Sequence, residues 1–474
     1  MNSPRHQLSE AIARLLQDWL PHQRWFGGKQ REIAHVRPVQ GRTLYDGGPD
    51  GPRLVQLIMT VVQETPDGER EELYQLMVGL RPYLPERLEH ARIGAFDDDG
   101  QHLVAYDASH DGELTTAILD LIAADAEVDG VRFRREDGMP VTAGLTSRPI
   151  TAEQSNTSVV FSDQYILKLF RKLHRGISPD VEVHRALRAV GCQHIAEPHG
   201  AIEGELDGAP VSYGILQRFF ANCADGWAMA TTSVRDLIAE ADLHADEVGG
   251  DFAAEAARLG QAVATVHADL AKALGTDVVP ADRVQTMVDR MNSRFDELLE
   301  RADELAPYAD QIRAAYAAMA ALGQAIPIQR IHGDLHLGQT LRTISHWVII
   351  DFEGEPARPL AERVTMMSPM RDVAGMLRSF DYAAHHLLFE HYAGEPHRPE
   401  SQLEYRAMEW SQRNRDAFCD GYASGGTDPR DHPVLLRALE LEKAVYEVGY
   451  ELDNRPAWVE IPLRSIARLL TPPR

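Results

Sequence analysis

The spacing of apolar residues changes once along the chain, and this change limits the folds that the sequence can adopt. Up to about residue 217 the apolar residues gather in short runs, whereas beyond about residue 224 they recur every three or four positions. Short apolar runs are typical of β-strands, and a spacing of three and four places residues on one face of an α-helix. The sequence therefore predicts a β-rich first half, a connection near residues 217–224 and a mostly helical second half.

Two groups of strands are predicted in the first half. In the first group, residues 54–63 and 73–80 are separated by a turn at residues 66–68, which predicts a hairpin. Apolar residues on one face of residues 8–20 predict an amphipathic helix in the same unit. The second group is predicted to form one sheet and comprises residues 158–161, 165–170 and 211–216. The other predicted elements are helices over 114–124, 180–190, 251–274 and 284–299 and strands over 131–133 and 347–350.

The composition narrows the classes of function. The 48 Lys and Arg residues against 72 Asp and Glu residues give a net charge of −24, which disfavours binding to nucleic acids and to anionic membranes. The 3 cysteines include no CxxC pair, and the segment Met1–Leu20 mixes charged residues with leucines, unlike a signal peptide. No stretch of about 18 apolar residues occurs. We therefore expect a cytoplasmic protein with neither a nucleic-acid nor a membrane partner.

The strongest chemical signal is a pair of acidic residues in the second half. Asp334 lies in the polar segment His332-Gly333-Asp334-Leu335-His336, and Asp351 follows an apolar strand. Phosphoryl transfer requires one carboxylate that accepts a proton from the attacking hydroxyl and another that holds Mg²⁺. The amide of Gln339 offers a further oxygen ligand for this metal. A structural loop and a hydrolase metal site remain alternatives for the same segment.

A second signal is Lys168, a lysine inside an apolar strand. Burying its ammonium group is costly unless an anionic group receives it. Glu182, on the predicted helix that follows, is suitably spaced to hold this lysine against phosphates. The polar turn before the strands offers amides and hydroxyls to phosphates, and its residues are Gln154, Ser155, Asn156, Thr157 and Ser158. The alternatives are that Lys168 extends to solvent, that Glu182 is an ordinary solvated residue and that the polar segment is an ordinary turn.

Together these motifs resemble the aminoglycoside-phosphotransferase and choline-kinase group of kinase-like folds. That group carries a His-Gly-Asp motif, a metal-binding Asn five residues later and an Asp on the next strand. Here Gln339 replaces the Asn, and the phosphate loop lacks a Gly-rich pattern. Both departures resemble the actinobacterial maltokinases. Further segments that resemble this family are Arg24–Lys29, Ala152–Ser158, Asp225–Ala230, Asp351–Pro356, Arg371–Met376 and Tyr446–Pro456.

The resemblance implies an α+β fold. It would be a two-lobed, protein-kinase-like fold with an extra N-terminal α+β cap on the nucleotide lobe and a mostly helical C-terminal lobe. The cap would comprise residues 1–88, and the intermediate, nucleotide-binding part of the N-lobe residues 89–222. Residues 223–474 would form the helical C-lobe, with the catalytic loop and the sugar site.

The resemblance also implies a reaction. Asp334 would act as the base on the C1 hydroxyl of maltose, Gln339 and Asp351 would bind Mg²⁺, and Lys168 with Glu182 would hold the phosphates of ATP. The product would be maltose 1-phosphate, a precursor for α-glucan (glycogen) synthesis.

The adenine and the sugar would occupy different segments. Adenine would lie at the connection near Gln217 to Ala221, which includes Phe219, and would be bound by backbone groups. The sugar is expected in the C-terminal half, because aromatic rings stack on sugars while arginines and carboxylates bind their hydroxyls. The candidate sugar residues are His336, Trp410, Arg413, Tyr446, Glu447, Glu451 and Arg455. Packing in the core is the alternative for each aromatic residue among them.

Other functions remain open at this stage. Glu447 and Glu451 would also suit the ammonium group of glucosamine, so a kinase of another sugar is the second hypothesis. A nucleotide-binding but inactive partner of a trehalose-converting enzyme is the third, although an inactive chain usually lacks one of Asp334, Asp351 or Lys168. A physical complex with such an enzyme is a separate possibility.

Structural roles are expected for several other conspicuous residues. Trp25 and Phe26 are expected in the core of the cap, and His332 is expected to orient its loop. Arg371 and Asp372 are expected to form a buried ion pair or to brace a loop.

Overall fold

The structure of the protein, a computed structural model, describes residues 4–29, 31–65, 68–98, 100–150, 155–240, 242–355, 358–391 and 402–471. It divides into two compact units. Unit 1 comprises Met1–Glu182 and Ala196–Ala221, and unit 2 comprises Val183–Ile195 and Asn222–Arg474. The change of unit after Ala221 coincides with the segment in which the spacing of apolar residues changes.

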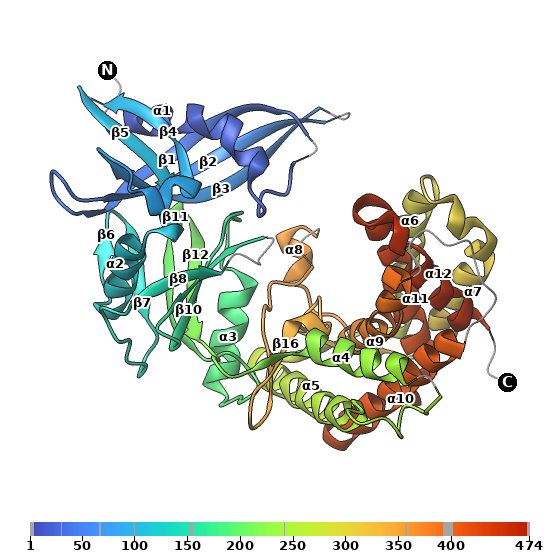
Figure 1. Ribbon diagram of the computed structural model, residues 1–474. Coiled ribbons are helices and arrows are strands. Elements are labelled where there is room, and N and C mark those ends of the chain that lie inside the picture. The colour runs from blue at the N-terminus through green and yellow to red at the C-terminus, as the bar shows by residue number, and fades with distance from the viewer. Residues whose placement is uncertain are drawn as a thin grey trace. The chain divides into compact units, whose positions relative to one another are not determined.

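The first part of unit 1 is a five-stranded antiparallel sheet in the order β1-β2-β3-β5-β4 (Figure 1). The strands are β1 (Ile33–Asp46), β2 (Arg53–Thr65), β3 (Gly68–Arg81), β4 (Arg92–Asp98) and β5 (Gln101–Asp107), and the helix α1 (Pro4–Trp19) packs on them through one apolar core. The predicted hairpin is confirmed as β2 and β3, although Pro66 and Asp67 of its turn lie outside the described residues. Because β4 and β5 belong to the same sheet, the boundary expected at residue 88 falls inside it.

The second part of unit 1 is a seven-stranded sheet in the order β6-β7-β11-β12-β10-β9-β8. Its strands are β6 (Glu127–Val128), β7 (Val131–Arg135), β8 (Ser147–Ile150), β9 (Thr157–Phe161), β10 (Tyr165–Leu169), β11 (Pro198–Leu206) and β12 (Ala209–Arg218). The helix α2 (Gly112–Ala123) shares its apolar core. The three strands predicted for one sheet are confirmed as the neighbours β9, β10 and β12.

Arg171 joins the two sheets of unit 1. Its side chain is 1% exposed, donates to Asp107 Oδ2 at 2.6 Å and to Thr157 Oγ1 at 2.7 Å, and lies over the ring of Trp25 at 4.8 Å. The expectation that Trp25 and Phe26 belong to the core is confirmed, since they are 8% and 1% exposed. Trp25 therefore contributes to the packing of the first sheet against the second.

Unit 2 is mostly helical around one apolar core (Figure 1). Its helices are α4 (Gly226–Ala239), α5 (Ala253–Leu274), α6 (Val284–Leu299), α7 (Ala309–Ala321), α8 (Leu360–Arg363), α9 (Met370–His391), α10 (Gln402–Gly425), α11 (Pro433–Asn454) and α12 (Glu460–Leu470). The helix α3 (Pro179–Ala189) contributes residues to both units. The small sheets are β13 (Ala224–Asp225), β16 (Thr340–Arg342) and β17 (Trp347–Ile349), and β14 (Thr276–Val279) with β15 (Ile326–Gln329). The helices predicted as 251–274 and 284–299 are confirmed as α5 and α6.

Glycines bring α5 and α10 close together. A Cβ atom on Gly260 of α5 would overlap the carbonyl oxygen of Phe418, and one on Gly421 of α10 would overlap that of Ala257. Each helix therefore packs its backbone directly on the other, which larger residues at these two positions would prevent.

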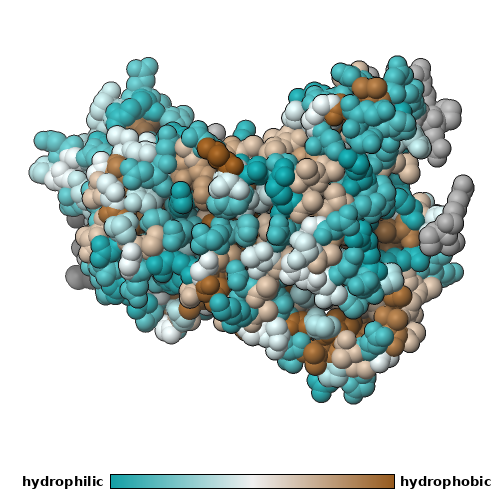
Figure 2. Space-filling model, turned by 90° about the horizontal axis from the view of Figure 1, so that it is seen from below, coloured by the Kyte–Doolittle hydropathy of each residue, from teal (hydrophilic) through white to brown (hydrophobic). Residues whose placement is uncertain are grey.

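On the face drawn in Figure 2, hydrophilic residues predominate and hydrophobic ones form small separate groups. In the described part of the chain, no helix is both long enough and apolar enough to cross a bilayer.

The close packing of α5 and α10 gives a prediction. Gly421→Ala should lower the free energy of unfolding of unit 2 by about 1–3 kcal/mol, because the methyl group has no space without a shift of backbone. Denaturant titration followed by near-ultraviolet circular dichroism measures the change. Gly426→Ala, where the nearest atom to the new Cβ is 3.7 Å away, is the matched control and should leave the curve unchanged. Equal midpoints for the two variants would contradict the proposed packing.

Candidate active site

The loop that carries Asp334 is held by a buried carboxylate. Asp372, in the first turn of α9 and 1% exposed, accepts hydrogen bonds from the backbone N–H of His332 at 2.8 Å and of Gly333 at 2.9 Å. His267 of α5 lies 3.0 Å from the same carboxylate through Nε2. Burial would raise the pKa of Asp372, but these partners hold it below its ordinary value. The loop-bracing role expected for Asp372 is confirmed.

His332 fixes the loop from its other side. Its Nε2 lies 2.9 Å from the carbonyl oxygen of Ile350, and its Nδ1 accepts from the N–H of Asp334 at 3.3 Å. The side chain thereby links the loop to the end of β17, as expected for an orienting residue. Gly375 of α9 permits a close approach here, because a Cβ at this position would lie 2.6 Å from the carbonyl oxygen of Leu335.

Asp334 has a cationic neighbour that the sequence did not indicate. Lys443 of α11 places its Nζ 3.2 Å from Asp334 Oδ1, and the two side chains are 27% and 22% exposed. Burial alone would raise the pKa of Asp334, but the ammonium group of Lys443 holds it below its ordinary value. Asp334 is therefore kept as a carboxylate, which is the form that can accept a proton.

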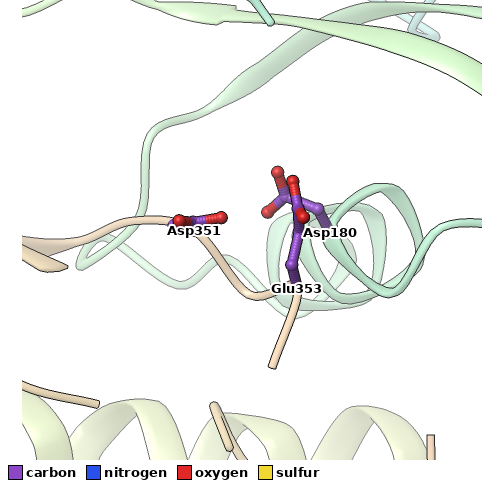
Figure 3. A group of neighbouring side chains, drawn as sticks. All are labelled: Asp180, Asp351 and Glu353. Atoms are coloured by element: carbon purple, nitrogen blue, oxygen red, sulfur yellow. The ribbon is translucent and has the colours of Figure 1, made fainter. Parts of the chain in front are cut away.

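Gln339 and Asp351 are brought together by the β16–β17 hairpin. The amide nitrogen of Gln339 donates to Asp351 Oδ2 at 3.1 Å, so its carbonyl oxygen is directed away from that contact. Asp351 has a φ of +67°, a left-handed conformation that is uncommon for a residue other than glycine. Figure 3 shows Asp351 and Glu353 on the loop after β17. Carboxylate and amide oxygens are ligands that suit Mg²⁺, so the residue types of the predicted pair fit this metal.

In unit 1, Lys168 lies in β10 and its Nζ is 3.2 Å from Asp180 Oδ2. Asp180 belongs to the first turn of α3 (Figure 3) and is fully buried. The same turn contains Glu182, the partner that was predicted for the lysine. A sequence signal for Asp180 existed, because it is an acidic residue at the predicted start of this helix.

Two buried polar atoms share the sheet face of Lys168. Ser158 stands opposite Lys168 in the β9–β10 ladder, and Gln217 stands opposite Ile166, two residues earlier in β10. Residues opposite each other in an antiparallel pair point to one face. Ser158 Oγ and Gln217 Nε2 are buried and have no hydrogen-bond partner in the described part of the chain. Such atoms are costly to bury, which suits a face that binds a polar ligand.

The other predicted phosphate and adenine residues have different surroundings. Gln154 lies outside the described residues, Ser155 is exposed and Asn156 is buried. Thr157 already accepts a hydrogen bond from Arg171. Phe219 follows β12, where its N–H donates to the carbonyl oxygen of Gln164 at 2.9 Å and Arg148 lies over its ring at 5.8 Å.

Two predicted sugar residues of α10 have partners within unit 2. Trp410 is 1% exposed, stacks on Phe252 at 6.2 Å and donates through Nε1 to Ser233 Oγ at 3.0 Å. The prediction that Trp410 stacks on the sugar is therefore wrong, because the spacing of apolar residues along α10 turns the ring into the core. Arg413 of the same helix pairs with Asp251 at 2.7 Å.

The predicted glutamates of α11 are both paired with arginines. Glu447 accepts two hydrogen bonds from Arg378, at 2.9 Å and 2.7 Å. Glu451 accepts from Arg455 at 2.9 Å and 2.6 Å and from the hydroxyl of Tyr382 at 3.1 Å. Their carboxylates are thus used within unit 2.

Tyr446 and His336 lie close to the Asp334–Lys443 pair. Lys443 Nζ is 5.1 Å from the ring centre of Tyr446, one helical turn along α11. Burial lowers the pKa of His336, so its imidazole is neutral near pH 7, and its Nδ1 accepts from the N–H of Gly338 at 3.1 Å. Of the predicted sugar residues, Tyr446 and His336 are those that the structure brings to Asp334. Lys443 was missed, although it precedes Tyr446 by three positions and therefore shares its helix face.

Two protein families match the chain. Residues 19–111 match the maltokinase N-terminal cap domain, and residues 146–410 match the phosphotransferase enzyme family. The second match covers more than half of the sequence. Both agree with the resemblance identified from the motifs.

Similar proteins include two kinases. A glucosamine kinase of Streptacidiphilus jiangxiensis is 29% identical over 342 residues, which are 70% of this chain and 74% of that protein. A glucosamine kinase of Mycolicibacterium smegmatis is 27% identical over 338 residues, which are 68% and 79% of the two chains. A solved structure of a glucosamine kinase with glucosamine, ADP and inorganic phosphate has a TM-score of 0.66 and 21% identity, covering 97% of this chain and 99% of that one. The expected kinase-like fold is confirmed.

The loop brace can be tested directly. Asp372→Ala removes the acceptor of two consecutive amides, so we expect deuterium exchange at His332 and Gly333 to become about tenfold faster or more. Exchange measured by mass spectrometry on a peptide that contains both residues reports the change. Asp310→Ala, at an exposed aspartate of α7, is the control. Unchanged protection at His332 and Gly333 in Asp372→Ala would contradict the brace.

Proposed function

The chain belongs to the phosphotransferase enzyme family, and we propose that it is an ATP- and Mg²⁺-dependent kinase that converts maltose to maltose 1-phosphate. The observation that carries the proposal is the partly buried carboxylate of Asp334, which lies on a loop held by both Asp372 and His332, in the same unit as the candidate metal ligands Gln339 and Asp351. A proton acceptor and a metal-ligand pair are the parts that phosphoryl transfer needs. The product would supply α-glucan synthesis.

Asp334 acts as the base in this proposal. The C1 hydroxyl of the sugar gives its proton to Asp334, its oxygen forms a bond to the γ-phosphorus, and the bond from that phosphorus to the β–γ bridging oxygen breaks, releasing ADP. Phosphoryl transfer leaves little covalent chemistry for the protein to perform. Positioning of the hydroxyl therefore provides most of the catalysis. The braces from Asp372 and His332 provide that positioning by restricting the loop.

Gln339 and Asp351 would hold the metal ion. When bound, Mg²⁺ would offset the negative charge of the phosphates. Lys168, set by Asp180, would hold phosphate oxygens, and Ser158 and Gln217 offer buried polar atoms on the same sheet face to the nucleotide. Each of these roles is separate from the choice of sugar.

Two observations favour different acceptors. The match of residues 19–111 to the maltokinase cap supports maltose. The two relatives and the solved structure described above are glucosamine kinases, which supports glucosamine as the second candidate. The pairing of Glu447 and Glu451 with arginines favours maltose, because neither glutamate is left to receive a substrate ammonium group.

Phosphorus NMR of a reaction with Mg²⁺–ATP and maltose tests the proposal. The expected product shows a sugar phosphate signal that couples to the anomeric proton, formed together with one ADP. A phosphate coupled to another sugar proton would refute C1 as the reacting position. Binding of ATP without product from any sugar would favour the inactive, regulatory hypothesis and a partner such as a trehalose-converting enzyme.

Asp334→Asn removes the base and keeps the size of the side chain. We expect kcat to fall by about 10³-fold or more, while the Kd for Mg²⁺–ATP changes less than about threefold, because the phosphate-binding residues are untouched. Steady-state kinetics and isothermal titration calorimetry measure the two quantities. Asp310→Asn is the matched control. Near-normal kcat in Asp334→Asn would rule out its role as the base.

The pH dependence follows from the neighbour of Asp334. Lys443 lowers the pKa of Asp334, whereas burial raises it. Lys443→Met removes the lowering charge, so the pKa of Asp334 should rise and the acid limb of kcat/KM should move to higher pH. The wild type should keep its activity to a lower pH than this variant. A Lys272→Met control, at an exposed lysine of α5, should leave the limb in place, and an unmoved limb in Lys443→Met would contradict the assignment.

A further inference from the structure

Lys443 lies beside the carboxylate that accepts the proton of the acceptor in the proposed reaction. Its Nζ is 3.2 Å from Asp334 Oδ1, and its side chain is 27% exposed. A base must be within hydrogen-bond reach of the hydroxyl that it deprotonates. Every acceptor used through Asp334 is therefore also a neighbour of the Lys443 ammonium group. An amino group on the same sugar ring would stand within one ring width of that charge.

The carboxylates near Lys443 already have cationic partners within the chain. Glu447 is paired with Arg378 at 2.7 Å, and Glu442, one residue before Lys443, is paired with Arg371 at 2.8 Å. Glu355 accepts from Arg358 Nε at 2.5 Å. Asp334 itself is paired with Lys443. Asp334, Glu355 and Glu447 act on the charge of Lys443, and each of these three carboxylates has a cationic partner, which for Asp334 is Lys443 itself.

We propose that Lys443 makes the acceptor site selective for uncharged sugars and excludes acceptors that carry an ammonium group. This inference rests on the proposed kinase activity and specifies its substrate class. A partly buried ammonium group repels a second one more strongly than water would allow, because the effective dielectric constant is lower there. A neutral sugar meets no such repulsion, and its hydroxyls can accept hydrogen bonds from Lys443.

The experiment compares sugars that differ at one carbon. The value of kcat/KM is measured for glucose, glucosamine and N-acetylglucosamine at pH 6.5, where glucosamine is mostly an ammonium ion, in the wild type, Lys443→Arg, Lys443→Gln and Lys443→Glu. We expect the wild type and Lys443→Arg to favour glucose over glucosamine. In Lys443→Gln the glucosamine-to-glucose ratio should rise about tenfold, and further in Lys443→Glu, because the repelling charge is removed and then reversed. The ratio of kcat/KM for N-acetylglucosamine to kcat/KM for glucose should stay constant through the series, because both sugars are neutral.

A second measurement needs no variant. Salt screens repulsion between charges, so the glucosamine-to-glucose ratio of the wild type should rise between low and high KCl. The glucosamine-to-glucose ratio could be independent of both residue 443 and salt in enzymes that still phosphorylate glucose. That result would overturn the selectivity proposed for Lys443 and leave the kinase proposal standing. Preference of the wild type for glucosamine would also overturn it. Absence of turnover with every sugar, maltose included, would overturn both proposals.

Discussion

The buried carboxylate of Asp372 is the interaction on which the candidate site depends. It receives two consecutive loop amides and His267, so one side chain joins α9, α5 and the loop that carries Asp334. Hydrogen bonds to a charged group contribute about 1.5–3 kcal/mol each, and leaving the carboxylate without them would expose its full desolvation cost. Asp372 therefore stabilises the loop against the two helices. His332 and the close contact at Gly375 add to this brace from the side of β17 and along α9.

Several carboxylates of unit 2 are held in buried ion pairs with arginines, so they are not available to a ligand. Arg378 joins Glu447 to Asp381, and Asp381 also accepts from Arg468 at 2.6 Å. Removing one member of such a network strands a buried charge, which costs about 3–5 kcal/mol. These carboxylates are consequently committed to holding helices together. In the proposed reaction the acceptor hydroxyl meets the Asp334–Lys443 pair instead, in which the Lys443 ammonium group lies beside the base.

Local patterns predicted the elements, and long-range contacts could not be predicted. The apolar spacing identified β2, β3, β10, α5 and α6, because strand and helix periods are visible in a few residues. The acidic residues of the site were also recognisable, since their loop and strand lie in one short segment. The pairing of Lys443 with Asp334 joins residues 109 positions apart, and no local pattern records it. Trp410 was misjudged for a related reason, because a ring in the core and a ring in a sugar site have the same local sequence.

A one-pot competition tests the central claim most directly. The wild-type protein receives Mg²⁺–ATP with equal amounts of maltose and glucosamine, and mass spectrometry measures both phosphorylated products during the first few per cent of the reaction. Equal concentrations make the product ratio equal to the ratio of the two kcat/KM values. A large excess of maltose phosphate is the predicted result. An excess of glucosamine phosphate would keep the kinase fold and the role of Asp334 but contradict a site built for an uncharged sugar.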